Sequence, residues 1–155
     1  MTLQTLHRRA LLVGVMAAAS AGPALARKPA PTPITVYKTP WCGCCSGWVT
    51  HLQANGFAPK VVELEDLAPI RARHGVADAL ASCHTGVVAG YAVEGHVPAA
   101  DIRKLLREKP KARGIAVPGM PIGSPGMEAP DGRRQPYETL LILPAGGTRV
   151  FARHA

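Results

Sequence analysis

Three of the chain's four cysteines stand within four positions, in the stretch TPWCGCCSGW at residues 39–48. A short run of β-branched and aromatic residues precedes it at 34–37 and predicts a strand. A helix is predicted from Cys44 or Cys45 to Asn55, because apolar residues recur there at helical spacing and a glycine follows. The three cysteines are therefore expected at a junction between a strand and a helix.

This position gives the cysteines a chemical role. The free N–H groups and the dipole at the start of a helix stabilise negative charge, so a thiol there loses its proton more readily. Cys42 and Cys45 have the C-x-x-C spacing of a thiol redox pair, which needs only two sulfurs. Cys44 is a third sulfur that can scramble a disulfide, and it favours a soft-metal site, for which Cu(I) and zinc are the candidates.

The N-terminus has the pattern of a secretory signal peptide over residues 1–26: Arg8 and Arg9, an uncharged run, and an A-x-A cleavage signal. Residues 27–33 are rich in proline and predict a linker, which leaves 34–155 as one domain. No segment of the mature chain has the length and hydropathy of a membrane span. Because exported thiols meet an oxidising environment, the cluster is expected to be either a switching disulfide or a set of metal-held sulfurs.

The formal net charge of +8 invites comparison with nucleic-acid-binding proteins. The basic residues are scattered, however, and the densest group lies on one predicted helix and its tail. Few aromatic residues are available for stacking on bases, and export removes the usual nucleic-acid partners. We therefore expect a solvated basic face and no nucleic-acid partner.

The order of predicted elements indicates an α/β fold with a thioredoxin-like core. A β-α-β unit covers 34–64, a helix 66–73, a hairpin 85–94, a helix 98–108 and a final hairpin 137–151. The hairpin that carries Cys83 is predicted as an insertion into this core. Residues 114–136, rich in Gly, Pro and Met, are predicted as one long loop, in which Pro118 is expected to be a cis-proline that faces the cysteines.

Further soft donors are available outside the C-x-C-C stretch. The hairpin can bring in Cys83 as a fourth sulfur, with the imidazole of His84 beside it. Met120 and Met127 each follow a glycine in the long loop and are candidate copper ligands, although methionines in such positions also fill gaps in a core. Four other histidines are expected at the surface without a specific role: His51, His74, His96 and His154.

Several motifs together resemble a known family. They are C-x-C-C at 42–45, S-C-H-T at 82–85, Y-A-V-E-G-H-V-P at 91–98, and G-M-P followed by G-S-P-G-M within 119–127. In this combination the chain resembles the bacterial family of exported metal-binding proteins, formerly of unknown function, that includes the copper-resistance protein CopG. The resemblance covers nearly all of the mature chain.

The resemblance implies a thioredoxin-like protein of the periplasm that holds copper, as Cu(I), for copper resistance or handling. Its implied ligands are Cys42, Cys44, Cys45 and Cys83, as a thiolate-bridged cluster if more than one ion is bound. We expect metal ions as partners, together with other periplasmic copper-handling proteins. A redox role for the cluster is compatible with this set, and no residue is assigned as catalytic.

Two other functions stay open on the sequence. One is a thiol-disulfide oxidoreductase that uses Cys42 and Cys45, with Cys83 as a third participant. The other is a structural module in which four thiolates hold zinc in tetrahedral geometry.

Overall fold

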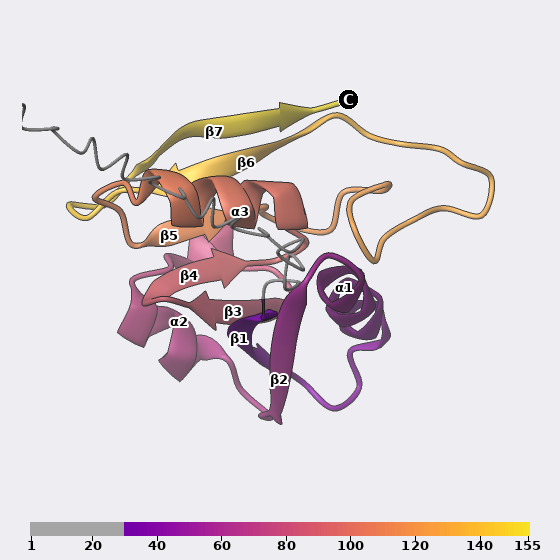
Figure 1. Cartoon of the computed structure of the whole chain (residues 1–155), viewed down its shortest axis with the longest axis horizontal. Coiled ribbons are helices and arrows are strands. Elements are labelled where there is room, and N and C mark those ends of the chain that lie inside the picture. The colour runs from indigo at the N-terminus through magenta and orange to yellow at the C-terminus, as the bar shows by residue number, and fades with distance from the viewer. Residues whose placement is uncertain (1–29) are drawn as a thin grey trace, which may run out of the picture.

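A seven-stranded sheet runs through the computed structural model, which describes residues 30–155 (Figure 1). Its spatial order is β2-β1-β3-β4-β5-β6-β7. In chain order the strands are β1 (Thr32–Lys38), β2 (Phe57–Glu63), β3 (His84–Val88), β4 (Tyr91–Glu94), β5 (Gly114–Ala116), β6 (Tyr137–Ile142) and β7 (Thr148–His154).

Three α-helices accompany the sheet: α1 (Gly43–Ala54), α2 (Ala68–His74) and α3 (Ala99–Glu108). A short 3-10 helix covers Asp78–Leu80. The predicted glycine after the first helix is confirmed, since Gly56 follows α1 with φ of +79°, and Gly75 ends α2 in the same way with φ of +69°. Within 30–155, no helix has the length and hydropathy needed to cross a membrane.

The predicted signal peptide, residues 1–26, and the start of the predicted linker lie outside the described residues. The linker was expected to reach residue 33. The first strand begins at Thr32, so the last two residues of that segment belong to the sheet.

The predicted β-α-β unit is confirmed, because β1 and β2 pair in parallel with α1 between them. The hairpin beside Cys83 was predicted as an insertion, and this placement is wrong. Its first strand, β3, pairs antiparallel with β1, and its second strand, β4, pairs in parallel with β5. The hairpin therefore forms the centre of the sheet.

Side chains of the central strands alternate between two faces, as strand geometry requires. Val93 and Ile115 belong to the main core, where they lie with Trp48 of α1 and with apolar residues of α3. Their neighbours Ala92 and Ala116 belong to a smaller cluster. Helices α1 and α3 thus share one face of the sheet, and the second cluster covers the other.

Two expectations for residues 114–136 are wrong. The segment begins with β5, whose three fully buried residues pair with a strand on each side. A strand of three residues is too short to show alternation, and its first residue, Gly114, belongs to a residue type that is uncommon in strands. That glycine is required, since a Cβ there would overlap the Ala92 carbonyl oxygen. Pro118 is not cis, because the described residues contain no cis peptide bond.

His154 was expected to lie in a tail without a role, and this too is wrong. It belongs to β7, and its Nε2 lies 2.9 Å from Oδ2 of Asp101 in α3. The Thr139 hydroxyl of β6 donates to the same carboxylate oxygen at 2.6 Å. The ring of His154 also stacks on Tyr137, with 4.5 Å between ring centroids. These contacts hold the C-terminal hairpin against α3.

The remainder of the predicted loop passes α1 on its way from β5 to β6 (Figure 1). Its closest approach joins two glycines. A Cβ on Gly47 would lie 2.9 Å from Cα of Gly126, and a Cβ on Gly126 would lie 2.6 Å from the backbone nitrogen of Trp48. Two facing glycines therefore allow the loop to contact the helix backbone directly.

We expect Gly47→Ala to destabilise the protein. This would oppose helix propensity, which favours alanine over glycine by about 1 kcal/mol at an exposed helix position. The added methyl group meets backbone, so the loop has to move away from α1. Gly43→Ala is the matched control, because a Cβ at this second exposed glycine of α1 has nothing within 4 Å. Urea denaturation of both variants measures the difference. Equal midpoints for the two variants would show that the contact between Gly47 and Gly126 does not contribute to the stability of the protein.

Candidate metal centre

The turn between β1 and α1 places three cysteines at the start of the helix. Cys42 occupies the N-cap position in an extended conformation, with φ of −79° and ψ of 97°, and no side chain caps the helix. Its N–H donates to the carbonyl of Thr39 at 3.1 Å. The helix begins at Gly43, so Cys44 and Cys45 lie in its first turn, where N–H groups lack partners within the helix.

Cys42 and Cys45 are joined by a disulfide, with 5.6 Å between their Cα atoms. Cys45 is fully buried, whereas the free cysteines Cys44 and Cys83 are partly exposed. The Cys45 sulfur lies 3.5 Å from the Cys83 carbonyl oxygen. This is a packing contact and not a hydrogen bond, because a disulfide sulfur carries no hydrogen.

Cys83 reaches the cluster through the pairing of β1 with β3. Lys38, the last residue of β1, is opposite His84, the first residue of β3, so Cys83 stands beside the cysteine turn. Its sulfur lies 3.7 Å from that of Cys44, which lies 3.6 Å from that of Cys42. All four sulfurs are within 4.8 Å of one another. Their proximity is as expected from the sequence, and their binding of metal stays a prediction.

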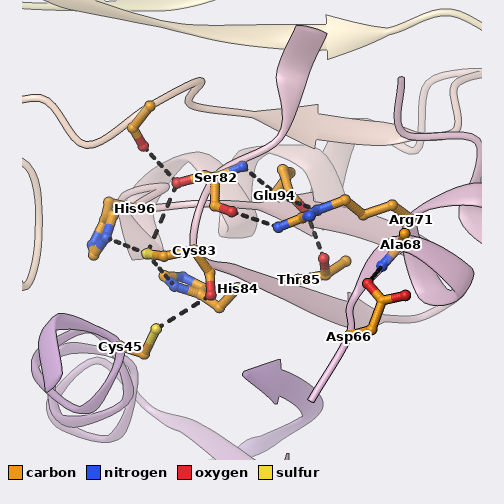
Figure 2. Close-up of polar contacts among 11 residues, drawn as sticks. Cys45, Asp66, Ala68, Arg71, Ser82, Cys83, His84, Thr85, Glu94 and His96 are labelled. Carbon is orange, nitrogen blue, oxygen red and sulfur yellow. Dashed lines mark hydrogen bonds and ion pairs between the residues drawn. The ribbon is translucent and has the colours of Figure 1, made fainter. Parts of the chain in front are cut away.

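His96 was expected at the surface and is instead fully buried. Its Nδ1 lies 2.8 Å from the Pro125 carbonyl oxygen, which can only accept a hydrogen, so the proton is assigned to Nδ1. Nε2 then carries the lone pair, and it lies 3.0 Å from the Cys83 sulfur (Figure 2). A carbonyl that fixes the tautomer in this way is typical of histidines that ligate metals.

His84, a candidate from the sequence, is also buried, and its Nδ1 lies 3.4 Å from the Cys83 sulfur. Its ring packs on Trp48 with 4.3 Å between centroids and meets His96 edge-on at 4.9 Å. Among the described residues, its Nε2 is the one buried side-chain nitrogen or oxygen atom without a hydrogen-bond partner. Cys83, His84 and His96 form a second group with the spacing of metal ligands.

Burial sets the protonation of these groups. It lowers the pKa of His84 to about 3 and also lowers the pKa of His96, so both imidazoles are neutral at pH 7. Burial, with the neighbouring Cys44 thiol, raises the pKa of Cys83 to about 12. In the metal-free protein the Cys83 thiol is therefore protonated and donates to His96. A metal that binds there has to displace this proton.

A groove of about 480 Å³ opens at the cluster and is lined by Cys42, Cys44 and Cys83. Trp41 and Met120 also line it, with 72% and 52% of their surface exposed. The buried Cys45 and the two histidines lie behind the groove. The site therefore has an accessible sulfur side and an enclosed side that carries nitrogen.

The structure separates the two loop methionines. Met120 is at the groove, whereas Met127 is half-buried and is not among the residues that line it. The loop contributes to the site chiefly through its backbone, because the carbonyl of Pro125 orients His96. His96 could have been suspected only from its place in the Y-A-V-E-G-H-V-P stretch, since nothing in its local pattern indicates burial.

Comparisons with known proteins agree with these motifs. Residues 80–127, which include S-C-H-T and both loop motifs, match the family described as protein of unknown function, DUF411. No curated protein sequence matches the chain.

Two solved structures of copper resistance protein CopG are similar over most of the chain. Form 2 has 46% identity and a TM-score of 0.76, with 81% of this chain and 99% of that chain covered. Form 1 has 47% identity and a TM-score of 0.75, with 80% and 98% covered. At this identity and coverage, the chain belongs to the DUF411 family that includes copper resistance protein CopG.

Proposed function

We propose that the protein binds Cu(I) in the periplasm, as cargo for copper resistance or handling, through Cys42, Cys44, Cys45 and Cys83. The observation that carries this proposal is the approach of four sulfurs to within 4.8 Å of one another. Thiolates are the ligands that Cu(I) prefers. The similarity to copper resistance protein CopG supports copper as the metal, and the predicted signal peptide at 1–26 supports export.

We further propose that the scaffold is thioredoxin-like. The order β1-α1-β2-α2-β3-β4-α3 and the spatial order β2-β1-β3-β4 support this assignment. So does a C-x-x-C pair at the start of α1, and strands β5, β6 and β7 then extend the core. In such a scaffold the helix start activates thiols, which is useful both for metal binding and for redox chemistry.

Cys44 has a specific purpose in this proposal. Its sulfur stands between those of Cys42 and Cys83, at 3.6 and 3.7 Å. A thiolate at this position can bridge two copper ions, which allows four sulfurs to hold more than one ion. Loading first requires an external dithiol, which gives two electrons and two protons to the Cys42–Cys45 disulfide and becomes a disulfide itself while Cys42 and Cys45 become thiols.

The histidines extend the site on its enclosed side. His96 Nε2 and His84 Nδ1 both face the Cys83 sulfur, so Cys83 would join the sulfur group to two nitrogen donors. Met120 at the groove supplies an exposed thioether for incoming Cu(I). A structural zinc site stays an alternative, because the same four sulfurs could hold zinc in tetrahedral geometry.

The first prediction concerns stoichiometry. Reduced protein titrated anaerobically with Cu(I) against a chromophoric chelator is expected to take up more than one ion per chain. Cys44→Ser should lower that number, because the central bridging sulfur is removed. Ser46→Ala, a change at an exposed neighbouring position of α1, is the control and should bind as the wild type does. Unchanged uptake by Cys44→Ser would remove Cys44 from the site.

The second prediction concerns the nitrogen donors. X-ray absorption of the copper-loaded protein should contain a nitrogen contribution that His96→Gln reduces, with at least about a tenfold loss of Cu(I) affinity. His51→Gln is the matched control. His51 is a partly buried histidine that belongs to neither group of candidate ligands, and its Nε2 accepts a hydrogen bond from the Ala99 N–H. An all-sulfur spectrum in the wild type would contradict the assignment of His96.

The Cys42–Cys45 disulfide favours one alternative, a thiol-disulfide oxidoreductase. In this function the two reduced thiols pass two electrons and two protons to a substrate disulfide, which leaves as a dithiol while Cys42 and Cys45 form the disulfide seen in the structure. Metal-free protein should then reduce or isomerise disulfides, and Cys42→Ser should abolish the activity. If the metal-free wild type is inactive in both assays, this alternative is excluded.

A further inference from the structure

A buried ion pair lies next to the segment that carries Cys83, and its Arg71 also lines the groove at the cysteines. Glu94 at the end of β4 is fully buried, and its Oε1 accepts a hydrogen bond from Arg71 Nε of α2 at 2.9 Å. Figure 2 shows this pair with Ser82 next to it. Burying two charges costs more than burying apolar side chains of similar size, so stability alone does not explain the pair.

Glu94 uses both of its oxygens to hold the chain around Cys83. Oε1 also accepts from the backbone N–H of Ser82 at 2.7 Å. Oε2 accepts from the Thr85 hydroxyl at 2.6 Å. The carboxylate therefore fastens one residue before Cys83 and one residue after His84.

Ser82 is held at three separate points. Its N–H donates to Glu94, its carbonyl oxygen accepts from Arg71 Nη2, and its hydroxyl donates to the Gly119 carbonyl oxygen. Gly95 packs against it so closely that a Cβ there would lie 2.7 Å from the Ser82 Cβ. The residue that precedes Cys83 thus has little freedom to move.

We propose that Glu94 and Arg71 are positioning residues that fix Cys83 for metal binding, an inference that rests on the proposed copper function. The Cys83 sulfur lies 3.0 Å from His96 Nε2 and 3.7 Å from the Cys44 sulfur, so a small shift of its backbone changes its distance to both. It extends from a backbone that the ion pair fastens from the opposite face of the sheet. Through Gly119, the same network holds the residue before Met120.

The test compares Glu94→Gln with the wild type in anaerobic Cu(I) titrations. Glutamine has the same shape and can still accept hydrogen bonds, but it lacks the charge that holds Arg71. We expect at least about a tenfold loss of Cu(I) affinity, as is usual when a partner of a metal ligand is changed. We also expect faster amide hydrogen exchange at Ser82 and Cys83 in the metal-free variant.

A double-mutant cycle separates positioning from general destabilisation. If Glu94 acts through Cys83, Glu94→Gln should have no further effect on Cu(I) affinity in a Cys83→Ser background. Asp101→Asn is the matched control, since Asp101 is a nearly buried carboxylate that binds Thr139 and His154 away from the cluster. It should leave copper affinity unchanged. Should Glu94→Gln fail to fold, Arg71→Lys replaces it, because lysine keeps the charge but has one nitrogen in place of the two guanidinium nitrogens that bind Glu94 and Ser82.

Three results would overturn the inference: wild-type affinity in Glu94→Gln, an equal loss in the Cys83→Ser background, or an equal loss in Asp101→Asn. Failure of the copper function itself is distinguishable. In that case the wild type takes up no Cu(I), and amide exchange at Ser82 and Cys83 alone decides whether the ion pair positions this segment.

Discussion

The antiparallel pairing of β1 with β3 is the constraint on which the site depends. The register that sets Lys38 opposite His84 brings the end of one strand beside the start of the other. The cysteine turn follows Lys38 and Cys83 precedes His84, so sulfurs 39 positions apart in the sequence become neighbours. A slip of one residue would turn every side chain of β3 to the other face. His84 would then leave Trp48, and Thr85 would leave Glu94.

Because side chains alternate along a strand, the two faces of the sheet carry different parts of the site. His84 packs on Trp48 of α1, on the face that carries the cluster, whereas the next residue, Thr85, bonds Glu94 on the face of α2. Thr85 and Glu94 are opposite each other in the β3–β4 pair, where cross-strand contacts are closest. The candidate ligand His84 therefore lies on one face of the sheet, and Glu94, which holds the backbone near Cys83, lies on the other. The backbone of Ser82 and Cys83 runs between them.

The sequence predicts those features that depend on residues close together in the chain, and it misses those that depend on residues far apart. The cysteine turn, the β-α-β unit and the glycine that follows α1 depend on neighbouring residues, and all three are predicted from the sequence. His96 could not be predicted as a buried residue, because its environment includes a carbonyl 29 positions later, at Pro125. The sequence predicts Glu94 only as the last residue of the hairpin at 85–94, because its partner Arg71 is 23 positions earlier. Strand β5 has only three residues, too few to show a period, and its partners on both sides determine it.

The proposed copper binding and the formation of the Cys42–Cys45 disulfide would use the same sulfur atoms. While Cys42 and Cys45 are joined, their sulfurs are not thiolates, and the free thiols are those of Cys44 and Cys83, beside two neutral imidazoles. Opening the disulfide returns two thiols to the group and raises its capacity for a soft cation. A third cysteine that would only disturb a simple redox pair is then an advantage, since its sulfur lies between those of Cys42 and Cys83. Copper handling and thiol redox chemistry are thus not independent candidates for this site, because the oxidation state of one pair of sulfurs determines how many ligands remain for the metal.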